Sequence, residues 1–177
     1  MDDIDEWLRQ GYPTAYRTAC LVLRDPVEAQ DATQEAFLKV WRFRTAIPDG
    51  EGRNAWLYRV VVNACLSRIR SERSRTGKDV GDAPLDHLAD SRDPAAEAEH
   101  SQRAGDVLAA LAELPEALRI PVVLRYYAGL SEKEIATAID RRPGTVKSRL
   151  YDAKQRLSLD PRLVGWSDGS PELKAVR

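Results

Sequence analysis

Apolar side chains recur at helical spacing along most of this chain, and that periodicity limits the fold more than any other feature. Ala29, Ala32, Ala36 and Val40, for example, fall on one face of a helix expected over residues 26 to about 44. No segment shows the sustained alternation of apolar and polar residues that is typical of strands. The sequence therefore predicts an all-α protein.

Turn-forming residues mark where the helices begin and end. Asp25 is a good helix cap, and Pro26 after it suits a first helical position. Residues 49–52, with two glycines and two acids, predict a loop before a further helix over about 54–72. Beyond residue 71 the helical pattern is lost until about residue 100, and the segment holds few large aliphatic residues.

These breaks predict two small helical domains in a chain of 177 residues. We expect a first domain over 1–72, a flexible acidic linker over 73–99, a second domain over 100–158 and an irregular tail over 159–177.

The charge is unevenly distributed, although the formal net charge is only −1. Residues 53–78 hold seven basic residues and one acidic residue, and residues 119–157 hold nine basic and four acidic residues. The segment between them, 79–118, holds two basic and ten acidic residues. Basic blocks are typical of proteins that bind polyanions, and solvated helix faces are the equally weighted alternative.

Several classes of protein are disfavoured. Cys20 and Cys65 have no partner at metal-ligand spacing, which predicts neither a disulfide framework nor a zinc site. The acidic start is unlike a signal peptide, and no apolar run approaches about 18 residues, so we expect a cytoplasmic protein without membrane insertion. There is no glycine-rich phosphate loop, and His87 and His100 lack a nucleophile partner. We therefore expect no enzyme, no catalytic residue, no metal and no cofactor.

Residues 131–157 have the pattern of a helix-turn-helix. Ser131 and Glu134 fit a capping box, Asp140 begins a tight turn, and Pro143 opens a second helix. An ordinary helical hairpin is the alternative. The second helix has one apolar face and one polar face, which suits the major groove of DNA. The candidate DNA-binding residues on it are Thr145, Lys147, Ser148, Arg149, Tyr151, Asp152 and Gln155.

The helix expected over 54–72 has a polar stripe that suits single-stranded DNA. Arg59, Asn63, Ser67 and Arg70 recur at helical steps, and they combine two cations with one amide. The preceding loop ends at Arg53, and Trp56 and Tyr58 bracket the start of the helix with aromatic rings. Alternatively, Trp56 belongs to the core.

At this point the chain resembles a known family, the extracytoplasmic-function (ECF) sigma factors of bacterial RNA polymerase. Segments 31–41 and 56–63 resemble two helices of sigma region 2. Segments 114–115, 124–127, 129–131, 134–136 and 144–150 resemble region 4. The match covers both expected domains in the right order, with no sign of the extra domains of primary sigma factors.

The resemblance implies a factor that directs core RNA polymerase to promoter DNA. Asp31, Gln34, Glu35 and Leu38 would contact the clamp helices of the largest polymerase subunit, and region 4 would meet the flap. No intramolecular partner is evident for the polar residues at 31–35. An anti-sigma factor and a nucleoid-associated location are implied as well.

The resemblance also implies how the promoter is read. The loop over 45–53, together with Asn63, would hold a flipped base of the −10 element, so Arg53, Trp56, Arg59, Asn63, Ser67 and Arg70 are the candidates there. The helix from Pro143 would read the −35 element as duplex. Three departures from the family pattern concern that helix-turn-helix.

Asp140 stands where the family has glycine, followed by Arg141 in place of an aliphatic residue, and aspartate tolerates the left-handed conformation that such a turn needs. Asp152 stands where a basic residue is common, and we hypothesise that it accepts a hydrogen bond from a cytosine amino group. The alternative is an ion pair with Arg149 or Arg156. For the whole chain the competing function is a stand-alone helix-turn-helix regulator, which would leave residues 31–63 unused.

Overall fold

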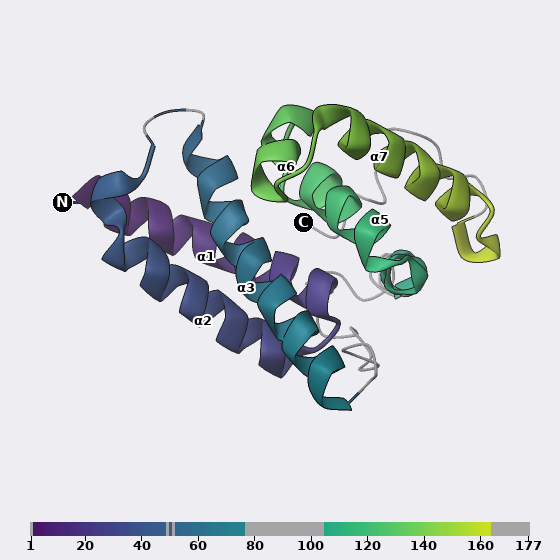
Figure 1. Ribbon diagram of the computed structural model, residues 1–177, viewed down its shortest axis with the longest axis horizontal. Coiled ribbons are helices and arrows are strands. Elements are labelled where there is room, and N and C mark those ends of the chain that lie inside the picture. The colour runs from purple at the N-terminus through teal and green to yellow at the C-terminus, as the bar shows by residue number, and fades with distance from the viewer. Residues whose placement is uncertain (1, 49, 51, 77–104, 164–177) are drawn as a thin grey trace, which may run out of the picture.

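The computed structural model describes residues 2–48, 50, 52–76 and 105–163 (Figure 1). Every regular element among these residues is helical, so the prediction of an all-α protein is confirmed. Most of the expected linker and residues 164–177 of the expected tail lie outside the described residues. The helices form two groups, which adjoin each other in Figure 1.

The first group consists of α1 (Asp2–Leu23), α2 (Pro26–Arg42) and α3 (Gly52–Thr76). The carboxylate of Asp25 accepts hydrogen bonds from the backbone N–H groups of Val27 at 2.9 Å and Glu28 at 3.0 Å, as the sequence predicts for a cap. The buried face of α2 is mostly alanine, which allows close packing against α1 and α3. The helix ends two residues before the expected limit, in a 3₁₀ turn over Arg44–Ala46.

Helix α3 is longer than predicted at both ends. It continues to Thr76, beyond the domain boundary expected at residue 72. Leu57, Val61, Ala64 and Cys65 are buried along its inner face, in agreement with the helical pattern of the sequence. The opposite side of the helix is therefore available for polar residues.

The second group begins with helical residues 105–113, followed by α5 (Glu116–Val122) and a π-helical segment, η3 (Val123–Tyr127). Pro121 lies inside α5, where it has no N–H to donate and its ring crowds the preceding turn. Directly after it the backbone widens, and Ala128 N–H bonds to the Val123 carbonyl five residues back at 3.1 Å. Gly129, with φ of 73°, then ends the segment as expected.

Helices α6 (Glu132–Ala138) and α7 (Pro143–Ser158) form the predicted helix-turn-helix. The capping box between Ser131 and Glu134 is present in both directions. Asp140 has φ of 52°, so the expected left-handed aspartate is confirmed in the turn. The backbone N–H of Arg141 closes that turn by donating to the Ala136 carbonyl at 2.9 Å. A short 3₁₀ helix, η4 (Pro161–Leu163), follows α7 within the tail that was expected to be irregular.

The two groups contact each other through α3 against α6 and through α1 against α5 and η3. Arg119 on α5 is only 6% exposed, and its Nη2 donates to the Val22 carbonyl at the end of α1 at 3.0 Å. Arg73 on α3 forms an ion pair with Glu116 on α5 at 3.1 Å. The two predicted domains are therefore packed together in this structure.

Candidate nucleic-acid interface

Helix α7 presents its polar row to solvent. Val146, Leu150, Ala153 and Leu157 are buried on the inner face, so the rotation of the helix is fixed by packing. The outer side carries five exposed candidates, Lys147, Ser148, Tyr151, Asp152 and Gln155, and two half-buried candidates, Thr145 and Arg149.

Two observations qualify the candidates of α7. The Ser148 hydroxyl donates to the backbone carbonyl of Thr145 at 3.0 Å, so its remaining capacity toward a base is as an acceptor. Asp152 forms no ion pair with Arg149 or Arg156 in the described part of the chain. Its carboxylate therefore faces solvent, as base contact requires.

The polar stripe of α3 is also exposed. Arg59, Asn63, Ser67 and Arg70 are all solvent-accessible on the side opposite the buried face. The aromatic residues differ, since Trp56 is half-buried and packs on the core, whereas Tyr58 is buried and is no candidate for base stacking.

The start of α3 is anchored by a residue that the sequence analysis did not single out. The indole N–H of Trp7 donates to the side-chain oxygen of Asn54 at 3.1 Å. The Arg53 guanidinium lies over the Trp7 ring, 4.9 Å from its centroid. Arg53 is therefore oriented by α1 before any ligand arrives. No periodic signal in the sequence connects these positions.

Two exposed aromatic residues at the end of α2 were also missed. Trp41 and Phe43 are 44% and 55% exposed, and the Arg44 guanidinium lies 4.9 Å from the Trp41 ring centroid. They lie at the entrance to the loop that precedes α3. Their position outside the apolar stripe of α2 was the available signal, because large aromatic side chains off the core face are candidates for stacking.

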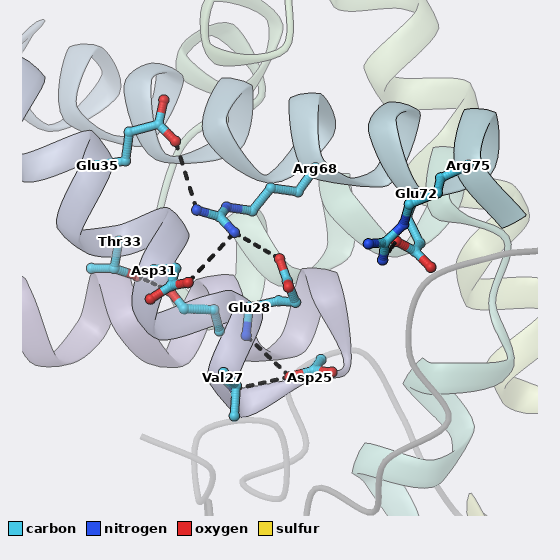
Figure 2. Close-up of polar contacts among 10 residues, drawn as sticks. Asp25, Val27, Glu28, Asp31, Thr33, Glu35, Arg68, Glu72 and Arg75 are labelled. Atoms are coloured by element: carbon cyan, nitrogen blue, oxygen red, sulfur yellow. Dashed lines mark hydrogen bonds and ion pairs between the residues drawn. The ribbon is translucent and has the colours of Figure 1, made fainter.

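The outer face of α2 carries the expected protein-binding residues. Asp31, Gln34, Glu35 and Leu38 are all exposed, and Leu38 retains 67% of its accessible surface. The acidic members of the set are not without partners, which corrects the expectation from the sequence. Glu35 accepts a hydrogen bond from Lys39 at 2.6 Å, and Arg68 on α3 lies 3.8 Å from both Asp31 and Glu35 (Figure 2).

These contacts change the electrostatics of the face. The hydrogen bond from Lys39 lowers the pKa of Glu35, and the charge of Arg68 acts in the same direction. Glu35 is therefore ionised over the physiological range.

The buried thiols behave in the opposite way, since burial raises the pKa of Cys65 to about 12 and also raises that of Cys20. Both cysteines are free and buried.

A cavity of about 310 Å³ is lined by residues of α3, α5 and the helix-turn-helix. Arg70 from the α3 stripe and Arg149 from α7 both line it, together with Arg73, Arg141 and Glu116. One candidate of each DNA-binding set therefore faces the same space, with basic side chains in excess over acidic ones.

The described residues contain no cluster of three or more potential metal ligands. No helix among them has the length and apolar character needed to cross a bilayer.

Family models match both helical groups. Residues 7–75 match the model described as Sigma-70 region 2, and residues 104–157 match the model described as Sigma-70, region 4. The two matches cover the α3 stripe and the α7 row respectively.

Curated proteins of similar sequence extend the comparison. The chain is 34% identical over 159 residues to the ECF RNA polymerase sigma factor SigE of Mycolicibacterium smegmatis, spanning 89% of this chain and 61% of that relative. It is 33% identical over 153 residues to the RNA polymerase sigma-H factor of Pseudomonas aeruginosa, spanning 80% and 78%. It is also 33% identical over 162 residues to the ECF RNA polymerase sigma factor SigM of Mycobacterium tuberculosis, spanning 92% and 77%.

Among solved structures, the sigma factor RpoE in complex with the anti-sigma factor NepR from Bartonella quintana has a similar fold. The TM-score is 0.72 at 22% sequence identity, and the match covers 89% of this chain and 96% of that chain.

Proposed function

The chain belongs to the ECF sigma factors, and from this premise we propose that it binds core RNA polymerase and directs it to specific promoters. In this proposal the α7 row reads the −35 element as duplex, and the α3 stripe reads the −10 element as melted single strand. The observation that carries the proposal is that one chain exposes both a helix-turn-helix row and a separate cationic stripe. A stand-alone regulator would need only the first.

At the −35 element, α7 would enter the major groove with Tyr151, Asp152 and Gln155 toward base edges. Lys147 and Arg149 would contact phosphates on either side. The buried inner face of α7 fixes the rotation of the helix, so this row would reach the groove without rearrangement.

At the −10 element, the exposed amide of Asn63 would pair with an extruded base, and Arg59 and Arg70 would neutralise the neighbouring backbone. Arg53 and Trp56 border the stripe at the loop. The exposed rings of Trp41 and Phe43 add stacking surfaces on the opposite side of that loop.

Core polymerase would dock on the outer face of α2. Leu38 supplies apolar area, and the acids at Asp31 and Glu35 suit a basic partner surface. The chain would act in the cytoplasm at the nucleoid, with no catalytic residue of its own. An anti-sigma factor is a further proposed partner, by analogy with the solved complex of the RpoE relative.

Promoter geometry requires the two helical groups to separate. Elements centred about 25 base pairs apart are roughly 85 Å apart along B-DNA, at about 3.4 Å per base pair. In the present structure Arg70 and Arg149 line one cavity. Binding to the polymerase would therefore replace the contacts between the groups with contacts to the polymerase.

The test is promoter binding and run-off transcription by the full chain, with and without core polymerase. We expect promoter-specific transcripts that require both components, and no specific duplex binding by the chain alone. Tight, sequence-specific binding of the isolated chain, with no transcript from the reconstituted mixture, would instead support the stand-alone regulator.

A further inference from the structure

Arg68 reaches from α3 to α2 and contacts three carboxylates on one face. Its Nη1 donates a hydrogen bond to Glu28 at 2.7 Å and lies 3.8 Å from Asp31, while its Nη2 lies 3.8 Å from Glu35 (Figure 2). Steps of three and four residues place the three acids on the same side of α2. One guanidinium therefore bridges a row of acids about two helical turns long.

Glu28 and Asp31 would be poorly ordered without Arg68. Glu35 would keep its hydrogen bond from Lys39. Three carboxylates on one helix face repel one another, and each long acidic side chain has several rotamers available. The forked guanidinium opposes both effects, because its two terminal nitrogens contact different carboxylates at once. A lysine at this position would keep the charge and lose the fork.

Stability alone does not account for the arrangement. The acidic side chains of the row remain about half exposed, at 43%, 56% and 46%, and ion pairs in such positions contribute little to folding. The row includes Asp31 and Glu35, which lie on the face assigned above to core polymerase. It is therefore the binding surface, more than the core, that Arg68 organises.

We propose that Arg68 is a positioning residue for polymerase docking, which holds Glu28, Asp31 and Glu35 in the arrangement that the polymerase surface meets. The proposal rests on the proposed function, which places polymerase on this face of α2. Side chains that are already ordered lose less conformational freedom on association. Arg68 would thus slow dissociation without touching the partner.

The charge of Arg68 has an opposite effect, and this makes the proposal testable. Removing the guanidinium leaves the face one unit more acidic, which speeds association with a basic surface at low salt. Loss of positioning predicts faster dissociation together with unchanged or faster association. A general folding defect predicts fewer active molecules, slower apparent association and an unchanged dissociation rate.

The experiment measures association and dissociation rates of the full chain on immobilised core polymerase at several salt concentrations. The variants are Arg68→Gln and Arg68→Lys. Arg75→Gln is the matched control, because Arg75 lies on the same helix and pairs with Glu72 in place of the α2 acids. Thermal unfolding is recorded for each variant.

We expect Arg68→Gln to dissociate about fivefold faster or more, from the ordering of two side chains. Its association should depend more steeply on salt than that of the wild type. The dissociation rate of Arg68→Lys should lie between those of Arg68→Gln and the wild type, and Arg75→Gln should dissociate at the wild-type rate. Dissociation of Arg68→Gln at the wild-type rate would overturn the proposal. If that variant does not fold, Arg68→Lys decides alone, and wild-type dissociation of that variant would also overturn the proposal.

Leu38→Asp separates this inference from the proposed function. Leu38 is 67% exposed, so the change should leave the fold intact and weaken docking on this face. If Leu38→Asp weakens binding while Arg68→Gln dissociates normally, only the role of Arg68 is wrong. If Leu38→Asp binds as the wild type does, the docking face itself is wrong, and with it the proposal for Arg68.

Discussion

Replacement of Arg119 by methionine should loosen the contact between the two helical groups. The guanidinium of Arg119 donates to the Leu114 carbonyl at 2.8 Å within the second group and to the Val22 carbonyl at 3.0 Å across the interface. The side chain is 6% exposed, so water has little access to replace either bond. Methionine fills similar space and donates nothing.

The size of the effect follows from the bonds that are lost. A hydrogen bond from a charged donor contributes about 1.5–3 kcal/mol. Loss of the Val22 bond should therefore shift the equilibrium between packed and separated groups by roughly 10- to 150-fold, at about 1.4 kcal/mol per factor of ten. Loss of the Leu114 bond should lower the free energy of unfolding of the second group by a comparable amount.

Energy transfer between dyes on Gln10→Cys and Ser158→Cys measures the separation, since both positions are exposed and lie in different groups. The matched control is Arg125→Met, because the Arg125 guanidinium donates to the Leu130 carbonyl at 3.1 Å, a bond within the second group. We expect Arg119→Met to show less energy transfer than the wild type, and Arg125→Met to match the wild type. Equal transfer in both variants, with the second group still folded by circular dichroism, would refute the reasoning.

Three further predictions concern the DNA-binding helices and the core. Asn63→Ala should reduce open-complex formation to an extent that depends on the −10 sequence, and equal effects on every −10 variant would mean that the residue is structural. Arg70→Ala should weaken binding to all promoters and lower the slope of log affinity against log salt concentration by about one. Asp152→Arg should change the preferred −35 base at one position, with discrimination of about 1–3 kcal/mol in binding assays, and uniformly tighter binding would mean that the residue acts through charge alone. Burial raises the pKa of Cys65 from 9.0 to about 12, so the native state retains a proton that the unfolded state loses, and stability should fall by about 1.4 kcal/mol per pH unit between those values. Cys65→Ala should reduce that slope by about 1.4 kcal/mol per pH unit in denaturant titrations, while the contribution of Cys20 remains. An unchanged slope would contradict the raised pKa of Cys65.

Local chemistry explains why much of the fold could be predicted. Asp25 and Pro26 define the start of α2 through their own backbone preferences, and the capping box at Ser131 does the same for α6. The inner and outer faces of α7 follow from its period, because Val146 and its neighbours leave only one rotation that buries them. The left-handed turn at Asp140 was predictable for the same reason, since few residue types tolerate it.

Contacts between distant segments were beyond such reasoning. Arg119 and Val22 are 97 residues apart, and Arg68 and Glu28 are 40 apart, so no periodic pattern relates them. The acids of α2 therefore lacked visible partners in the sequence. Tyr58 illustrates the same difficulty, because an aromatic residue beside a polar stripe can face either way until the packing is known. Pro121 did carry a local signal for the π-helical segment, although its consequence depends on how the next turn packs.

The arginines of α3 act on different faces of one helix, and this determines how their roles can be separated. A helix of 25 residues turns through many revolutions, so Arg68 can meet α2 while Arg70 lines the cavity toward α7 and Arg73 pairs with Glu116. A displacement of α3 would change all three surfaces at once, whereas loss of a single side chain changes one. A variant of Arg68 that alters polymerase dissociation but leaves the dye distance between the groups unchanged therefore acts at α2. A variant that changes both acts through the position of the helix, and its effect on docking must then be compared with that of Arg119→Met.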